Sequence, residues 1–403
     1  MTARARAATA LVACLVHLAL FVPLVGHRSQ SAQGEFWGDA ESLVHGGRPY
    51  ADRNFEYPPL ALPVLAAPLA VSHAPQSYAR GFSVEMIIAD LAIVLLLSLG
   101  LGARRERVWS AVGVYTAGVA LLSGTAIEVH HLVQKDALPL ARFDLVPAAC
   151  VLAAVLARQA RRSATWSLLL SIGAAIKAFP VVLFAVLVRG ERHPARVALA
   201  AAVPLAAAAL LVVAIGDEFG SAIAYQSHRE LQIESLGASP LLLGHLAGLH
   251  VYPHEADGSR NLLGDGTGLA LAASSALLVI GWLVVLWRTW AGRVPLLQAA
   301  TAMLAVTIVF APVLSPQYLL WLLPLSAAAY GLRAPNVALI AACALTALEL
   351  HLYRGVATLA PSFDLAVSAR NAVLLAYLAL ILAPILARRP VPEAPVVGGG
   401  LAA

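Results

Sequence analysis

The chain has 403 residues, of which 60% are hydrophobic and only 12% are charged, and its formal net charge is +5 at pH 7. Soluble domains average about 45–50% apolar and about 25% charged residues. The mean hydropathy of +0.80 therefore excludes a soluble enzyme, a disordered chain and a nucleic-acid-binding domain, and it predicts a polytopic α-helical membrane protein.

The first apolar segment, residues 7–25, follows Arg4 and Arg6. It is close to the ~20 residues that cross the hydrocarbon core, and no small-residue cleavage site follows it. We therefore interpret it as a membrane helix rather than a signal peptide. Further apolar runs lie at about 81–101, 108–124, 144–158, 164–188, 195–215, 267–288, 295–312, 317–332, 336–353 and 366–387. Together they predict an all-α, polytopic transmembrane helix bundle of about 10–12 spans.

Two stretches depart from a plain membrane helix. Lys177 and Pro180 interrupt the run at 164–188, which predicts either two short half-helices or one tilted, broken helix. Residues 58–71 are apolar but contain four prolines, which disfavour one straight helix. We expect them to form a juxtamembrane element that lies along or dips into the outer surface.

The arginines set the predicted orientation, because basic residues collect in cytoplasmic loops. If residues 58–71 do not cross the membrane, one side holds 16 basic and only three acidic residues. The basic clusters are Arg4/Arg6, Arg104/Arg105/Arg107, Arg158/Arg161/Arg162, Arg189/Arg192/Arg196, Arg288/Arg293, Arg333 and Arg388/Arg389. We expect a multi-pass protein of the plasma (inner) membrane with both termini in the cytoplasm.

This topology predicts one integral-membrane domain over residues 1–387 and a disordered, Pro/Gly-rich cytoplasmic tail over 388–403. The long connecting segments, at about 26–57, 125–143 and 216–266, all fall on the exoplasmic side. A site built from loops therefore faces the exoplasm.

Acidic and aromatic residues alternate in the first outer loop, GEFWGDAESLVHGGRPYADRNFEYPP, over residues 34–59. Aromatic rings cover the C–H faces of sugars, and carboxylates accept hydroxyl hydrogen bonds or act as general bases. The pattern favours a sugar site, although solvated loops with interfacial aromatic residues share this composition.

Four more segments on the predicted outer face carry distinctive residue patterns. These segments are RFDLVP at Arg142–Pro147, IKAFP at Ile176–Pro180, HRELQIESL at His228–Leu236 and SPQYLLW at Ser315–Trp321. In the first loop, the corresponding residues are Asp39, Gly47–Tyr50 and Phe55–Leu60. Taken in order, over roughly residues 36–321, these segments resemble glycosyltransferase family 87. That family comprises polyprenyl-phosphate-sugar-dependent membrane mannosyltransferases of the GT-C fold.

The resemblance implies a hexosyltransferase. It would move a sugar, with mannose expected, from a polyprenyl-phosphate donor to a hydroxyl of a cell-envelope glycolipid or glycan at the exoplasmic face. Asp39 corresponds to the aspartate that GT-C enzymes place in the first outer loop, so it is the expected general base, followed by Glu56 and then Asp52. The expected substrate-binding residues are Arg48, Tyr50, Tyr57, Arg142, Asp144, Lys177, His228, Arg229, Gln232, Glu234, Ser235, Gln317 and Tyr318.

Cations are needed to hold the phosphate leaving group. Lys177, Arg229 and His228 are the candidates for this role. Alternatively, Lys177 snorkels to the membrane surface, and Arg229 and His228 are solvated loop residues without a role in binding. Arg142 and Asp144 are expected to form an ion pair at a helix entrance. Gln232, Glu234 and Ser235 would line the sugar pocket, or else belong to an amphipathic surface helix.

Other ligands and activities stay open. No cofactor is required, although a divalent cation is compatible with oxygen ligands from Asp39 and Glu56. Arabinofuranosyl transfer from a similar lipid donor is the nearest alternative activity. A transporter or lipid flippase is an alternative from a different class, because Glu85, Asp90 and, more weakly, Glu349 fall in apolar runs.

Overall fold

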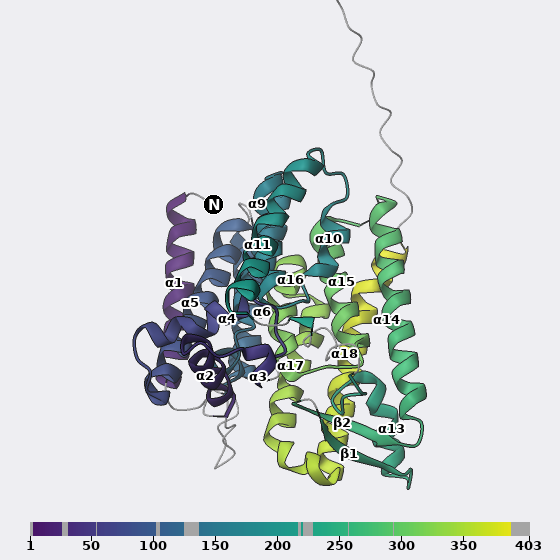
Figure 1. The fold of residues 1–403 in the computed structure, drawn as a ribbon. Helices are drawn as coiled ribbons and strands as arrows, with labels where there is room; N and C mark the ends of the chain where they lie inside the picture. The colour runs from purple at the N-terminus through teal and green to yellow at the C-terminus, as the bar shows by residue number, and fades with distance from the viewer. Residues whose placement is uncertain are drawn as a thin grey trace, which may run out of the picture.

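The computed structural model describes residues 3–25, 31–53, 55–101, 105–124, 137–216, 219–220, 229–256, 258–292 and 294–387. Most of them are helical (Figure 1). The only strands in these stretches, β1 (Val251–Ala256) and β2 (Ser259–Gly264), form an antiparallel hairpin. The predicted tail at 388–403 and the candidate residue His228 lie outside the described residues.

Six of the described helices are long and apolar enough to cross a membrane. They are α1 (Ala3–Phe21), α5 (Pro75–Gly100), α11 (Pro194–Ala214), α14 (Thr267–Trp290), α17 (Ala334–Leu352) and α18 (Pro361–Ala387). At about 1.5 Å per residue, about 20 residues reach across the hydrocarbon core. The prediction of an all-α, polytopic membrane bundle is confirmed.

Shorter helices account for the remaining apolar runs. They are α6 (Arg105–Leu122), α8 (Leu145–Gln159), α9 (Ser163–Ile176), α10 (Val181–Leu187), α15 (Leu296–Phe310) and α16 (Leu319–Tyr330). Nearly every side chain of α15 and α16 is buried, as expected for helices that are apolar all round. Few side chains of α11 and α14 are buried, so these two helices lie at the rim of the bundle.

The predicted interruption of the run at 164–188 is present, in the form of two half-helices. α9 ends at Ile176, Lys177 takes an extended backbone conformation, and Pro180 directly precedes α10. The end of α9 leaves carbonyl groups without helical partners. The Ala175 carbonyl accepts a hydrogen bond from the Leu60 amide at 2.9 Å, so the break is tied to the first outer loop.

Residues 58–71 form α4 (Ala61–Ala66) and the 3-10 turn η2 (Ala67–Ala70). Ten helical residues extend only about 15 Å, which is half of the hydrocarbon thickness. α4 packs against α2 (Ser31–Val44), and η2 packs against α5. This short, packed element agrees with the expected juxtamembrane segment.

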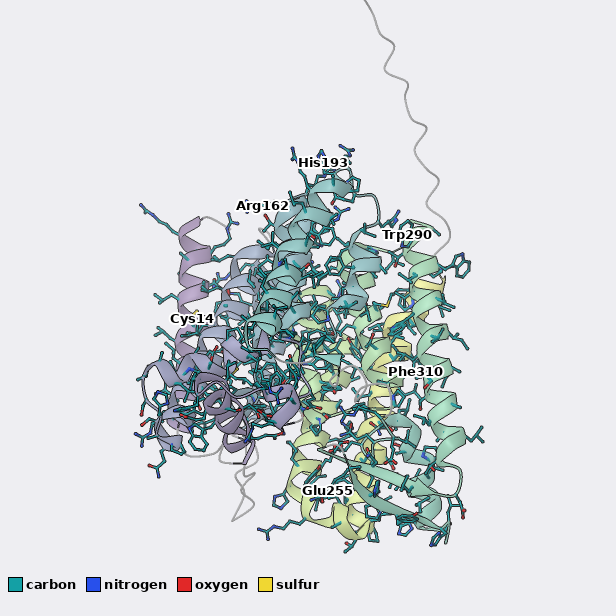
Figure 2. All side chains as sticks on the ribbon, in the orientation of Figure 1. Cys14, Arg162, His193, Glu255, Trp290 and Phe310 are labelled. Atoms are coloured by element: carbon teal, nitrogen blue, oxygen red, sulfur yellow. The ribbon has the colours of Figure 1, made fainter. Side chains whose placement is uncertain are left out.

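The loop elements gather at one end of the bundle. In Figure 1, α2, α3 (Pro49–Arg53), α13 (Ser239–His245) and the hairpin lie at the lower end, whereas α1 begins at the upper end. Figure 2 labels Arg162 and His193 at the upper end and Glu255 at the lower end. The small elements left are α7 (Leu138–Ala141), η1 (Val22–Leu24), η3 (Leu236–Ala238), η4 (Pro316–Tyr318) and η5 (Tyr353–Thr358).

A buried polar cluster ties α1, α5 and α6 together. His17 Nδ1 lies 2.7 Å from Asp90 Oδ2, and the Tyr115 hydroxyl donates to Asp90 Oδ1 at 2.7 Å. His17 Nε2 lies 2.8 Å from the Thr116 hydroxyl. Both carboxylate oxygens of Asp90 therefore have partners, which favours a structural clamp over an ion relay.

Replacing Asp90 with alanine is expected to lower the free energy of unfolding by about 2 kcal/mol, because it leaves the His17 ring and the Tyr115 hydroxyl buried without their partner. Unfolding of the purified protein in detergent measures the change. Ser98→Ala is the control, because the Ser98 hydroxyl is buried on the same helix with no hydrogen-bond partner among the described residues. Equal stability of the two variants would contradict the clamp.

Candidate functional site

A tight turn after α2 brings Arg53 back onto Asp39. Gly46 takes a positive φ of 80°, which suits glycine. The Gly47 amide donates to the Ser42 carbonyl at 2.7 Å, and a Cβ at Gly47 would lie 2.9 Å from that oxygen, so a larger residue does not fit. Arg53 Nε then donates to Asp39 Oδ1 at 2.7 Å. The turn thereby pairs the predicted base with an arginine.

The surroundings of Asp39 make its carboxylate more basic than usual. Burial raises the pKa of Asp39 to about 6; the Arg53 hydrogen bond and charge act in the opposite direction, and the charges of Glu35 and Glu56 add to the increase. At pH 7 the carboxyl group is therefore mostly ionised, yet it takes up a proton more readily than an exposed aspartate. These are the properties that a general base needs.

The break after α9 places the Lys177 ammonium inside the protein. Its Nζ lies 2.8 Å from Asp144 Oδ1, and the lysine side chain is only 10% exposed. Four aromatic rings have centroids 4.9–5.9 Å from Nζ, those of Tyr57, Phe143, Tyr318 and Trp321. Cation–π attraction is strongest where water is excluded. The Lys177 ammonium is therefore enclosed by protein side chains, which argues against a lysine that snorkels to the membrane surface.

Asp144 does not form the ion pair expected with Arg142. α8 and α9 pack side by side, so the start of α8 meets the end of α9 and Asp144 pairs with Lys177 instead. Trp321 Nε1 donates to the same oxygen, Asp144 Oδ1, whereas Oδ2 has no hydrogen-bond partner within the described stretches. The Arg142 guanidinium lies over the Phe36 ring, 5.8 Å from its centroid.

Aromatic packing joins the first loop to the start of α8. Phe36 and Tyr57 contact Phe143, with ring centroids 5.5 Å and 4.8 Å apart. Tyr50 is buried, and its hydroxyl donates to the Tyr57 carbonyl at 2.8 Å. Burial raises the pKa of Tyr57 well above its ordinary value, so its phenol stays protonated. Tyr50 and Tyr57 thus hold the loop in place around Lys177.

Glu56 and Arg229 connect the first loop to the large loop. Arg229 Nη1 lies 3.4 Å from Glu56 Oε2, across 173 positions of sequence. The Arg229 side chain is 14% exposed, so the alternative of a solvated loop arginine is wrong. Two predicted site residues from distant motifs therefore meet.

Gln232 and Ser235 fix the course of the large loop. The Gln232 amide donates to the Pro312 carbonyl at 3.0 Å, and Nε2 of the same residue lies 3.3 Å from the Ser315 hydroxyl. The Ser235 hydroxyl accepts from the Ala238 amide and so caps η3. These contacts replace the amphipathic surface helix considered from the sequence.

Glu234 is 1% exposed and accepts from Gln232 Nε2 at 2.7 Å. Burial raises its pKa above the usual range; the charge of Glu349 adds to this increase, and that of Arg370 opposes it. The buried Glu234 side chain supports the loop from within.

The remaining predicted residues divide into two groups. Tyr318 stacks on Trp321 with centroids 3.9 Å apart, and half-buried Gln317 belongs to the same turn, η4. Arg48 lies apart from the Lys177 cluster: its side chain is 54% exposed, and Nη2 lies 3.7 Å from Asp52 Oδ1. Arg48 and Asp52 therefore form a surface pair.

Several residues of the site were not among the predicted ones. Arg53 pairs with Asp39, but the sequence alone does not distinguish an arginine in an ion pair from an exposed one. Trp321 closes a predicted motif but was not selected. Arg370 and Asn371, which donate to the Glu234 carbonyl at 2.8 Å and 3.1 Å, lie in a predicted membrane run, and the charge of Arg370 in that run was the available signal.

Oxygen ligands for a metal are scarce at this site. The described residues contain no group of three or more His, Cys, Asp or Glu side chains that could hold a metal ion. Asp39 and Glu56, the ligands suggested by the sequence, each face an arginine.

Comparison with known families places the site in context. The model of glycosyltransferase family 87 matches residues 55–316, about two thirds of the chain. The match includes Glu56, Asp144, Lys177 and Arg229, and it begins 16 residues after Asp39. No match was found among curated proteins.

Proposed function

The chain belongs to glycosyltransferase family 87, a family of GT-C membrane enzymes, and from this we propose that it transfers mannose from a polyprenyl-phosphate donor to a hydroxyl of a cell-envelope glycolipid or glycan. The main support is that the first loop carries a basic, buried carboxylate, Asp39, and also contacts two cations, the buried Lys177 and the mostly buried Arg229. A sugar-phosphate reaction needs both kinds of group.

In the proposed reaction Asp39 accepts the proton of the acceptor hydroxyl. The acceptor oxygen forms a bond to the anomeric carbon as the bond from that carbon to the phosphate oxygen breaks. The phosphate leaves with the bonding electron pair, and the proton stays on Asp39 until it passes to solvent. A single displacement of this kind inverts the anomeric centre.

Lys177 and Arg229 are the proposed phosphate ligands. Each is paired with a carboxylate, Asp144 or Glu56, that a phosphate could replace as the counter-ion. Negative charge grows on the phosphate in the transition state, and cations shielded from water stabilise that charge most strongly. The aromatic rings around Lys177 supply this shielding.

The proposed orientation puts the loop end of the bundle in the exoplasm. Arg162, from one of the arginine-rich connections, lies at the opposite end in Figure 2, and that end would face the cytoplasm. The lipid donor would then reach the loops with its phosphate at the outer boundary of the bilayer.

The transporter hypothesis loses part of its support. It depended on intramembrane acids, and one of them, Asp90, is hydrogen-bonded at both oxygens to His17 and Tyr115, whereas the buried Oε2 of Glu85 has no hydrogen-bond partner among the described residues. Family membership also favours an enzyme. Arabinofuranosyl transfer remains the alternative reaction, because the site features named here suit any sugar attached to polyprenyl phosphate.

Transfer assays with a panel of donors test the proposal. The purified protein is given a lipid extract as acceptor and radiolabelled mannose on polyprenyl phosphate, arabinofuranose on polyprenyl phosphate, or GDP-mannose. Label is expected in glycolipid from the first donor only. Transfer from the arabinofuranosyl donor alone would replace the sugar but keep the enzyme class, and transfer from GDP-mannose alone would contradict the lipid donor.

The pH dependence of transfer tests Asp39 as the base. Activity is expected to fall as pH drops through about 6, because the base is then protonated. Arg53 lowers the pKa of Asp39, so Arg53→Gln is expected to move this acidic limb to higher pH. Profiles of kcat/KM between pH 5 and 8 measure the shift, and Arg48→Gln, at the exposed arginine nearby, is the control. Coinciding limbs for wild type and Arg53→Gln would contradict the assignment.

A further inference from the structure

The loop segment at residues 229–235, called here the donor segment, is held from inside the bundle by two residues of α18. Arg370 Nη2 donates to the Glu234 carbonyl at 2.8 Å. Asn371 Nδ2 donates to the Glu234 carbonyl at 3.1 Å and to the Ser235 carbonyl at 3.0 Å. Both side chains are fully buried. They lie beyond the region matched by the family model.

We propose that Arg370 and Asn371 are positioning residues, which fix the donor segment so that Arg229 meets Glu56 and can bind the donor phosphate. The inference rests on the proposed function, because it assigns the placement of a proposed phosphate ligand to α18.

The donor segment has few ways to move while these bonds remain. The Ile233 amide donates to the Arg260 carbonyl at 3.0 Å, and the Leu262 amide donates to the Leu231 carbonyl at 2.8 Å, so one edge of the segment pairs with β2. The Gln232 amide is bonded to Pro312 on another side. Arg370 and Asn371 of α18 hold the C-terminal end of the segment through the Glu234 and Ser235 carbonyls, and Arg229 is its first residue. Loosening that end would let the segment shift along the hairpin and displace Arg229.

Charge makes Asn371 the better of the two test positions. Arg370 Nη2 also lies 3.3 Å from Glu349 Oε2, and both side chains are fully buried. Removing Arg370 therefore leaves a buried carboxylate without its counter-ion, which destabilises the fold regardless of positioning. Asn371 is neutral, and its amide nitrogen bonds only to the two carbonyls and the Ser239 hydroxyl among the described contacts.

Asn336 provides a matched control. It is fully buried on α17, and its Nδ2 donates to the carbonyls of Ser326 at 3.0 Å and Gly331 at 2.6 Å. It therefore fixes two backbone carbonyls, as Asn371 does, but neither belongs to the donor segment. A general loss of stability should appear in both Asn371→Ala and Asn336→Ala.

The first measurement is hydrogen exchange of the donor segment in the intact protein, which does not depend on activity. Asn371→Ala is expected to speed exchange of the Gln232 and Ile233 amides by at least about tenfold relative to Asn336→Ala. Unchanged exchange at these amides would overturn the positioning role, whatever reaction the protein catalyses.

The second measurement is binding of polyprenyl phosphate to wild type, Asn371→Ala, Arg229→Gln and the double variant. Each single change is expected to weaken binding about tenfold, and the double variant should bind no more weakly than Arg229→Gln, because both changes disable one contact. If the double variant bound polyprenyl phosphate more weakly by the product of the two single effects, Asn371 would not act on binding through Arg229, and the proposal would be overturned. Failure of wild type to bind would contradict the lipid-phosphate donor, and the exchange experiment would still decide the positioning role.

Discussion

Replacing Asp39 with asparagine is expected to lower the rate of sugar transfer by about a thousandfold, the scale of a lost general base. The amide keeps the size of the side chain and a hydrogen-bonding oxygen for Arg53, but it cannot take the acceptor proton. Single-turnover transfer from polyprenyl-phosphate mannose measures the chemical step. Donor affinity is expected to change little, because the proposed phosphate ligands are Lys177 and Arg229.

Folding and catalysis can be separated at this position. The pKa of Asp39 in the folded protein, about 6, lies above the ordinary value of 3.8, so the stability linked to its proton is present below about pH 4 and is lost as pH rises through 6. At pH 7.5 the buried, ionised carboxylate lowers the free energy of unfolding, so Asp39→Asn should be no less stable than wild type. Asp52→Asn, at an exposed aspartate of α3, is the control and should retain full activity. If Asp39→Asn kept more than a tenth of the activity, Glu56 would become the base.

Replacing Lys177 with methionine is expected to have two consequences. It leaves Asp144 as an unpaired buried charge, which should lower the free energy of unfolding by about 3 kcal/mol. It also removes a proposed phosphate ligand, which should lower kcat/KM for the lipid donor by about a hundredfold. Detergent unfolding and donor titrations measure the two effects on the same preparation.

A double variant distinguishes these effects. Lys177→Met with Asp144→Asn removes both charges, so stability should recover largely while the loss in kcat/KM persists. Recovery of both quantities would mean that Lys177 serves the fold alone and that Arg229 holds the phosphate.

Hydropathy was enough to locate the apolar helices, because each apolar run had to bury its backbone polar groups in helical hydrogen bonds, but it did not reveal α2, α3 and α13 in the predicted loops. The break at Lys177 was also predictable, since a lysine and a proline together oppose a continuous membrane helix. Proline content likewise disfavoured one straight helix over residues 58–71, where the structure has the short α4 and the turn η2. These features depend on local chemistry, which a sequence displays directly.

The ion pairs of the site were harder to predict, because they depend on which helix ends meet. Asp144 lies two residues from Arg142 but pairs with Lys177 across the α8–α9 contact. The pairing of Asp39 with Arg53 depends on the turn at Gly46 and Gly47. Motifs therefore named most residues of the site, whereas their partners emerged only from the packing.

The shortness of three inner helices has a consequence for how the protein would respond to its lipid environment. α8, α9 and α16 have 15, 14 and 12 residues, which corresponds to lengths of about 18–23 Å against a hydrocarbon core of about 30 Å. Asp144, Lys177 and Tyr318 stand at the ends of these helices. In the proposed orientation, with the arginine-rich end at the cytoplasmic surface, these ends would lie several ångströms below the opposite surface. A donor phosphate must then be drawn beneath the level of neighbouring headgroups, so a thinner bilayer should ease donor entry and a thicker one should slow it.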